Sequence, residues 1–219
     1  MKHLLSLIAV LALVSCISIN SDVVVPDGEE VDGISSVNGT VRIGVASIVN
    51  GDISTVNGSV FTAERSQAGE IETVNGKIEI GSESVTQGME TINGAIQIGE
   101  GALVDGDVGT VNGRVTVGDG ARVSGEVRAV NGQLLVQGAE VGSLLNVNGG
   151  MVLESGTTVN GELRVRKPRG SDGDPVTVEI HDNVRVVGPL VFERSVTLRV
   201  HEGAELGEIE GAEPEYFND

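Results

Sequence analysis

The stretch TVNGRVTVGDGARVSGEVRAVNG, from Thr110 to Gly132, carries Val-Asn-Gly at both ends, and this triplet recurs along most of the chain. Successive asparagines of the triplet are separated by 19, 18, 18, 19, 19 and 17 residues. They are Asn38, Asn57, Asn75, Asn93, Asn112, Asn131 and Asn148, with Ile92 replacing the valine once. A near-constant period of this length is typical of a protein built from stacked structural repeats.

Each repeat divides into three pieces of six or seven residues. The apolar anchors that follow Val111 are Val117, Val123 and Val130. Within a piece, apolar and polar residues alternate, which is the period of a strand with one buried face. The pieces are too short for helices and rich in β-branched residues. The sequence therefore predicts an all-β chain, folded as a single-stranded three-sided parallel β-solenoid with about 18–19 residues per turn.

Stacked turns lie about 4.8 Å apart, so roughly seven to nine turns would form a rod of about 35–45 Å. Equivalent aliphatic residues should then form columns along the axis, and we expect one such column to hold Val74, Ile92, Val111 and Val130. No single turn can bury its inner face alone, so stacking must supply the core. The drift of the period between 17 and 19 residues favours a right-handed coil over the left-handed coil of strict six-residue pieces.

The Asn-Gly pairs are predicted to form one corner of every turn, because both residues tolerate left-handed backbone angles. Stacked asparagines can also exchange hydrogen bonds along the row, as in cross-β ladders. A hairpin is the competing interpretation of Asn-Gly, but a meander would not return to the same triplet at this period. The glycines of this corner are Gly39, Gly58, Gly76, Gly94, Gly113, Gly132 and Gly149.

The N-terminus has the pattern of an export signal. Lys2 precedes an apolar run that is shorter than the roughly 20 residues of a membrane span, and Leu-Val-Ser-Cys closes at Cys16, the only cysteine. These four letters resemble a bacterial lipobox, which implies lipidation of Cys16 and anchoring to a membrane. By resemblance to the usual sorting pattern of such lipoproteins, a residue other than Asp after the cysteine, here Ile17, favours the outer membrane. The alternative is a plain secretory signal with a chance cysteine.

The chain is expected to divide into five parts. Residues 1–15 form the lipoprotein signal peptide, and residues 16–33 form the lipidated cysteine and a tether, with an entry strand following the tether within residues 17–30. Residues 34–165 hold the regular repeats, and residues 166–175 form a loop rich in Gly and Pro. Residues 176–219 keep the strand pattern without Asn-Gly, and we interpret them as closing turns, a C-terminal cap and an acidic tail.

The net charge of −18 argues against nucleic acid as a partner, because such a surface repels phosphates. Carboxylates are oxygen ligands for divalent cations, which leaves weak cation binding open beside the simpler interpretation of a solvated charged face. The candidate carboxylates are Asp105, Asp107, Asp119, Asp172 and Asp174.

The sequence contains no set of residues that predicts catalysis, a bound metal or a cofactor. Some hexapeptide solenoids are acyltransferases that use a histidine as general base, and others build a zinc site from three histidines. After the signal segment only His181 and His201 remain, and both are expected to face solvent from strands. We therefore predict that the protein is not an enzyme.

Two segments, GALVDGDV at Gly101–Val108 and GARVSGEV at Gly120–Val127, resemble the repeat of bactofilins, a family of polymer-forming bacterial cytoskeletal proteins. The TVNG element is similar to repeats of bacterial putative-adhesin solenoid domains. The resemblance implies a right-handed three-sided solenoid without catalysis and, for bactofilins, filaments assembled end to end. The export signal and the expected cap depart from the bactofilin pattern.

These observations predict a non-catalytic, lipid-anchored protein of the cell envelope, with the outer membrane favoured, whose rod has a structural, scaffold or adhesin-like binding role. Its partners would be the membrane through Cys16 and either another envelope protein or further copies of itself. The alternative is a bactofilin-like protein that polymerises, and an acyltransferase-like enzyme is the least favoured hypothesis.

Overall fold

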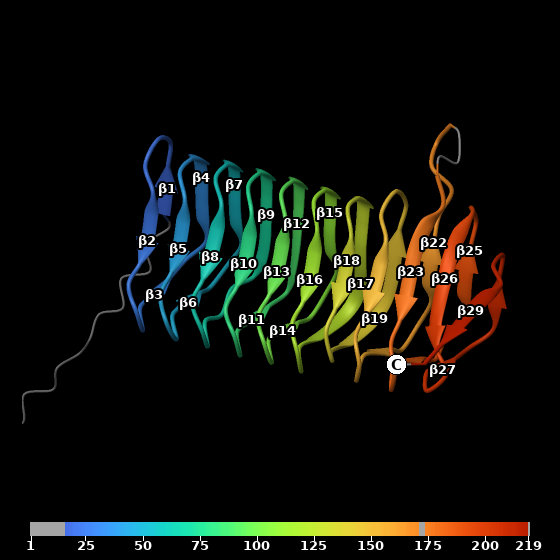
Figure 1. Ribbon diagram of the computed structural model, residues 1–219. Coiled ribbons are helices and arrows are strands. Elements are labelled where there is room, and N and C mark those ends of the chain that lie inside the picture. Colours follow the sequence, from blue (N-terminus) through green and yellow to red (C-terminus); the bar gives the residue numbers. More distant parts are fainter. Residues whose placement is uncertain (1–15, 171–173, 219) are drawn as a thin grey trace, which may run out of the picture.

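The computed structural model describes residues 16–170 and 174–218, and within them all regular structure is β-strand. The strands are parallel and stack as a β-solenoid, which confirms the predicted fold class. Successive coils lie side by side along one axis, from β1 at one end to β27 and β29 at the other (Figure 1).

Each turn visits three faces, which we name in the order in which the chain reaches them. The first face holds β1 (Cys16–Ser18), β4 (Ile34–Asn38), β7 (Ile53–Asn57), β9 (Glu70–Asn75), β12 (Gly88–Asn93), β15 (Val108–Asn112), β22 (Leu163–Val165), β25 (Leu190–Phe192) and β28 (Ile209–Glu210). The second face holds β2 (Val23–Val25), β5 (Val41–Ile43), β8 (Val60–Thr62), β10 (Ile78–Ile80), β13 (Ile96–Ile98), β16 (Val115–Val117), β18 (Leu134–Val136), β20 (Met151–Leu153), β23 (Val176–Ile180), β26 (Val196–His201) and β29 (Pro214–Phe217). The third face holds β3 (Glu30–Val31), β6 (Ile48–Val49), β11 (Val85–Thr86), β14 (Leu103–Val104), β21 (Thr158–Val159), β24 (Arg185–Val186) and β27 (Glu205–Leu206). Two longer strands, β17 (Arg122–Asn131) and β19 (Glu140–Asn146), continue from the third face onto the first.

The second face contains eleven stacked strands, which exceeds the seven to nine turns expected from the sequence. The additional turns lie at both ends of the repeat region. Residues 16–33, expected to be a tether, instead supply β1, β2 and β3, and these strands pair in register with β4, β5 and β6. The expected tether is therefore the first turn of the solenoid, formed without the Val-Asn-Gly signal.

The C-terminal part continues the same stack. Residues 166–170 and 174–175 contain no strand and belong to the segment between β22 and β23, which projects beyond the coils (Figure 1). Register is kept across it, because Met151 of β20 pairs with Val178 of β23. The expected acidic tail contains β29, which pairs in parallel with β26.

The core consists of aliphatic columns, as strand alternation predicts. On the first face one inward position is filled in consecutive turns by Ile34, Ile53, Ile71, Met89, Val108, Val127, Leu144, Leu163 and Leu190, all buried. Each of these side chains packs on its equivalents above and below, so aromatic residues are not needed to fill the narrow interior.

The column expected at Val74, Ile92, Val111 and Val130 exists, but it lies on the outside of the molecule. Strand pairs on both sides of Ile92 place it directly between Val74 and Val111, and Ile92 is 46% exposed. The preceding residue faces inward instead, and Thr91 is buried. The alternation of in and out therefore places the valine of the triplet outside, where the chain approaches the corner.

The corner glycines are required by close stacking rather than by left-handed backbone angles. None of the corner asparagines or glycines has a positive φ in the described residues. A Cβ added to Gly94 would instead lie 1.8 Å from the carbonyl oxygen of Gly76. Consecutive turns repeat this contact, with 1.9 Å at Gly76 and Gly113 and 1.7 Å at Gly132.

The left-handed residues form a row at another corner, between the second and third faces. Glycine fills many positions of this row, but Ala46, Arg65, Glu83 and Asn183 also have φ between 52° and 57°. A left-handed angle costs a residue with a Cβ roughly 1–2 kcal/mol. The glycines of the row are Gly28, Gly101, Gly120, Gly138 and Gly156.

We predict that Gly94→Ala destabilises the solenoid strongly, because its Cβ can be accommodated only by separating two turns. We expect a loss of about 3 kcal/mol or more, measured as a fall in the urea midpoint. Gly101→Ala is the matched control, since its Cβ meets nothing nearer than Glu83 Cγ at 3.8 Å and suffers only the left-handed strain of about 1–2 kcal/mol. An equal loss in both variants would contradict the stacking explanation.

Candidate functional site

The triplet asparagines form a continuous hydrogen-bonded ladder along the corner between the first and second faces. In each step the side-chain Nδ2 of one asparagine donates to Oδ1 of the asparagine one turn earlier. The donors and distances are Asn57 2.9 Å, Asn75 2.9 Å, Asn93 2.8 Å, Asn112 2.8 Å, Asn131 2.9 Å and Asn148 2.9 Å. Their glycines occupy the next position in the same corner, where the backbones approach most closely.

Two residues that the sequence analysis missed extend this ladder. Asn38 donates to Asn20 Oδ1 at 2.8 Å, and Asn20 can be recognised only by its distance of eighteen residues from Asn38, because Ser21 follows it. At the other end Arg194 is buried, and its Nη1 donates to Asn148 Oδ1 at 3.2 Å and to the carbonyl of Val147 at 2.9 Å. A cation therefore terminates the row of amide dipoles.

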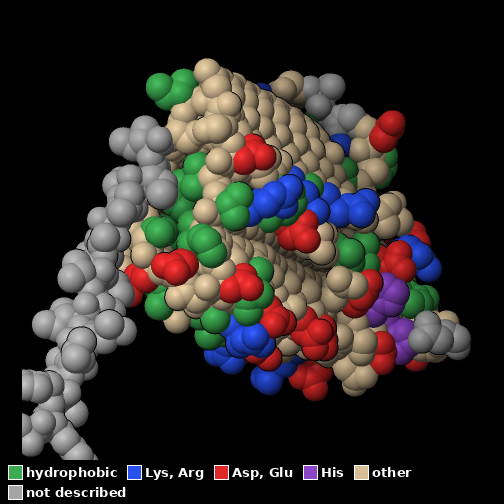
Figure 2. Space-filling model, turned by 90° about the vertical axis from the view of Figure 1, so that its left-hand side faces the viewer, with side chains coloured by type: hydrophobic (Ala, Val, Ile, Leu, Met, Phe, Trp, Pro, Cys, Tyr) green, Lys and Arg blue, Asp and Glu red, His purple; other side chains and the backbone are tan. Residues whose placement is uncertain are grey.

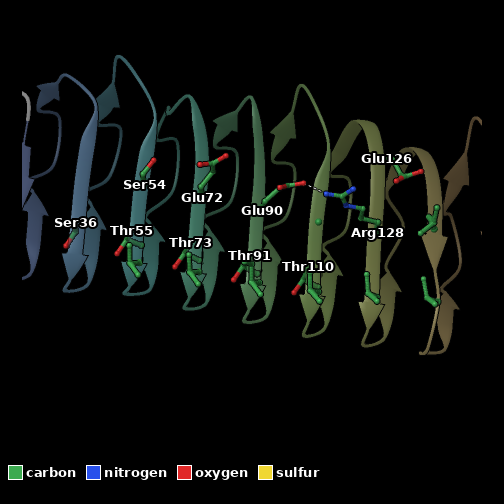
Figure 3. A pocket seen from close by; sticks show the side chains of 18 of the residues that line it. Ser36, Ser54, Thr55, Glu72, Thr73, Glu90, Thr91, Thr110, Glu126 and Arg128 are labelled. Atoms are coloured by element: carbon green, nitrogen blue, oxygen red, sulfur yellow. Dashed lines mark hydrogen bonds and ion pairs between the residues drawn. The ribbon is translucent and has the colours of Figure 1, made fainter. Parts of the chain in front are cut away.

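A buried row of hydroxyl residues runs beside the ladder on successive strands (Figure 3). Thr73, Thr91 and Thr110 each donate a hydrogen bond to a corner glycine carbonyl of the preceding turn, at 3.0, 3.1 and 2.9 Å. Thr55 occupies the same position, but its Oγ1 is buried without a hydrogen-bond partner. In β19 the equivalent residue is Asn146, which donates to Gly132 O at 2.8 Å.

The outer surface of the first face is a shallow groove of about 780 Å³ that follows the solenoid axis. One of its sides is an exposed aliphatic row, in which Val56, Val74, Ile92 and Val111 line the groove and Val37 extends the row beyond it. The exposed fractions of these five side chains are 36% to 46%. Val130 and Val147 continue the row and also line the groove. The groove is therefore a long surface on which an apolar contact repeats with every turn.

The outward residues beside this row give the groove its charge. Glu72 and Glu90 lie in consecutive strands, and Arg128 crosses Gly109 to form an ion pair with Glu90 two turns away (Figure 3). A Cβ on Gly109 would lie 2.7 Å from Arg128 Nε, so this glycine makes room for the arginine. The β9 and β12 part of the groove is thus acidic, and a basic residue follows beyond it.

One carboxyl group beside the acidic part of this groove has a raised pKa. The pKa of Glu70 is raised by partial desolvation and by the neighbouring charges of Glu72, Asp52 and Glu90. The view from the β1 end shows acidic side chains spread over the visible surface, with basic ones among them (Figure 2).

Among the described residues, no group of three or more His, Cys, Asp or Glu is arranged to hold a metal ion.

The candidate cation-binding carboxylates that the structure describes form no group of three or more. Asp107 Oδ1 accepts the backbone N–H of Glu126 at 2.8 Å, and Asp105 Oδ1 accepts the Ser124 hydroxyl at 3.1 Å. Each therefore bridges two turns. Asp172 lies outside the described residues.

The two histidines were expected to face solvent, but both contact the last strand and are only partly exposed. The His181 and His201 rings pack edge-on against Phe217, with centroid distances of 6.0 and 5.4 Å. His201 Nδ1 accepts the backbone N–H of Gly203 at 3.0 Å, and His181 lies 3.4 Å from a Glu179 oxygen. Both imidazoles thus have structural contacts at the C-terminal end of the rod.

The predicted lipidation site lies at the edge of the described structure. The backbone of Cys16 begins β1, whereas the signal segment 1–15 lies outside the described residues. Across residues 16–170 and 174–218, no helical segment is long and apolar enough to cross a bilayer.

Comparison of the chain with protein-family models, with curated proteins and with solved structures finds no match. The site therefore has to be interpreted from its own geometry. That geometry consists of a rigid corner ladder beside an exposed apolar row on a partly acidic groove.

The hydroxyl row gives a stability prediction with a built-in control. Thr91→Val should cost about 1 kcal/mol, because it removes the bond to the Gly76 carbonyl and leaves that group buried. Thr55→Val should be neutral or stabilising, because its hydroxyl is buried without a partner. Urea midpoints of the two variants test this. Equal losses would show that the hydroxyl bonds contribute nothing.

The carboxylate repulsion gives a pH-dependent prediction. The folded-state pKa of Glu70 is raised. Its contribution to the free energy of unfolding is therefore most favourable below the ordinary glutamate pKa, and it is lost as the pH rises through the folded-state pKa. Glu70→Gln should therefore stabilise the protein slightly at pH 7, by at most about 0.5 kcal/mol because solvent screens the charges. The gain should vanish near pH 3, as followed by urea unfolding.

Glu79→Gln is the matched control for this experiment. Glu79 forms an ion pair with Lys77 at 2.6 Å, so its loss should not stabilise the protein at pH 7. A gain in both variants would point to overall net charge instead of the local cluster.

Proposed function

We propose that this protein is a non-catalytic lipoprotein of the cell envelope, anchored through Cys16, whose solenoid acts as a scaffold or adhesin-like rod. The outer membrane is the favoured location, because Ile17 follows the cysteine. The rod would hold a partner at its first face. The observation that carries the proposal is the exposed aliphatic row along the groove.

This row differs from ordinary surface hydrophobics because it is contiguous. Singly exposed apolar residues are common on soluble proteins, whereas contiguous apolar patches typically mark interaction surfaces. The ladder and hydroxyl bonds beneath the row hold it rigid, so a partner would dock without a large ordering cost. Catalysis has no comparable support, and an acyltransferase-like activity remains the least favoured hypothesis.

A second function, bactofilin-like polymerisation, is favoured by the ends of the rod. In the sheet order of the described strands, β1 and β2 end the stack on one side, and β27 and β29 end it on the other. Such terminal strands offer backbone groups that another copy can pair with. This contrasts with the expected cap, because β29 is a regular parallel strand.

A crosslinking experiment tests the groove. A photoreactive benzoylphenylalanine placed at Ile92 should crosslink to a discrete envelope protein in living cells, and the same residue at Gln97 should not. Gln97 is exposed in the same turn, but it lies on the second face. Val74→Asp should lower the crosslink about tenfold, which corresponds to a loss of about 1.4 kcal/mol in binding. Equal capture from both faces would overturn the proposed binding role.

Negative-stain microscopy of the mature chain separates the two functions. A rod that acts singly should appear as short particles at micromolar concentration. Long filaments built from the ends would favour polymerisation and contradict the scaffold proposal.

A further inference from the structure

The first turn of the solenoid begins at the residue that would carry the lipid. Cys16 is the first residue of β1, and it pairs with Ile34 of β4. The sheet order places β1 and β2 at the extreme end of the stack. If Cys16 is lipidated, as the proposed function requires, the lipid is joined to a terminal strand without an intervening tether.

Hydrogen bonds fix the residues that directly follow Cys16 to the body of the solenoid. Ser18 Oγ donates to the Ser21 carbonyl at 2.6 Å, which closes the first corner. The Ile19 carbonyl accepts the backbone N–H of Asn38 at 3.0 Å, and Asn20 accepts the side chain of the same residue. The anchor point is therefore fixed to the rod within its first five residues.

Three of the five carboxylates in residues 16–33 are directed toward the second turn, and the other two are Glu29 and Asp32. Asp22 Oδ1 accepts the N–H of Thr40 at 2.7 Å, and Asp27 Oδ1 accepts the N–H of Val45 at 2.8 Å. Glu30 accepts the side chain of Asn50 at 2.6 Å. These bonds hold three negative charges on the side of the first turn that faces away from the end of the rod.

Apolar side chains are exposed in the same turn. Ile19 and Val24 are 65% and 64% exposed, the highest values among the large hydrophobic residues of the described chain. Their positions flank the corner between β1 and β2. Aliphatic side chains at such a position gain free energy by entering the interface of a bilayer.

The long sides of the rod present a different surface. The chain holds 32 acidic and 14 basic residues, and the carboxylates recur on turn after turn. Laying such a side on a bilayer would place many charges near the head groups and desolvate them. Only the end formed by the first turn combines the anchor, strongly exposed aliphatic groups and three carboxylates that are bonded to the next turn.

We infer that the first turn is a membrane-docking surface and that the rod stands end-on, with its axis along the bilayer normal. The first turn then lies in the head-group region, where lipid oxygens and water meet the outer edge of β1 and β2. Eleven strands on the second face at about 4.8 Å per spacing place the C-terminal turn about 50 Å above the surface. The groove on the first face runs upward from the membrane.

Neutron reflectometry on a supported bilayer tests this orientation. Residues 16–219 are coupled through the Cys16 thiol to a maleimide-bearing lipid in a phosphatidylcholine bilayer, which attaches the chain at the same sulfur as natural lipidation. An end-on rod should give a protein layer about 50 Å thick. A rod on its side should give about 20 Å, since one face has roughly six residues of about 3.3 Å each. The thin layer would overturn the inference.

A linker variant provides the control. Twenty Gly and Ser residues inserted between Cys16 and Ile17 should free the first turn, and the layer should lose its sharp outer boundary. An unchanged profile would contradict the role given to the fixed anchor, because the exposed Ile19 and Val24 side chains alone would then hold the rod end-on. Mass spectrometry of Cys16 in protein from native membranes tests the proposed lipidation separately, since the chemical coupling does not depend on it.

Discussion

The structure depends on one distance, the spacing of about 4.8 Å between hydrogen-bonded parallel strands. Every turn must match its neighbours at this spacing on three faces, so each position in the repeat sees copies of itself above and below. Each position therefore favours residue types that can pack against, or hydrogen-bond to, the same residue type in the adjacent turns. Aliphatic residues fill the inside, amides that both donate and accept form the Asn corner ladder, and glycines occur where two backbones nearly touch.

The same spacing explains why polar order accompanies the core. In the buried hydroxyl row and its continuation, side chains donate hydrogen bonds to backbone carbonyls of the preceding turn. Thr91 does so with Gly76, and Asn146 does so with Gly132. At Thr55 the buried hydroxyl has no hydrogen-bond partner. The corner is thus a coupled unit in which glycine, threonine and asparagine depend on one another, and the exposed valine is held outside between them.

Period and alternation were sufficient to predict the fold, because both are imposed by strand geometry. They were insufficient near the corner, where the chain stops alternating and places Val111 and Asn112 both outside. The reason for Gly94 could not be read from its neighbours, since the atom it avoids belongs to Gly76 one turn earlier. A complete turn in residues 16–33 was not predicted beyond a single entry strand, because the strands there lack the triplet. Arg194 was missed because its ladder partner is 46 positions away in the chain.

The segment between β22 and β23 shows how such an architecture tolerates change. The chain leaves the stack after Val165, yet Leu163 pairs with Leu190 and Met151 pairs with Val178 as if no extra residues intervened. The number of residues in a turn is therefore independent of the spacing between turns. A turn can carry an outward loop while its strands keep their register with the adjacent turns. An insertion at such a point adds an external loop at a fixed position along the axis, so the surface can change while the packing of the core stays the same.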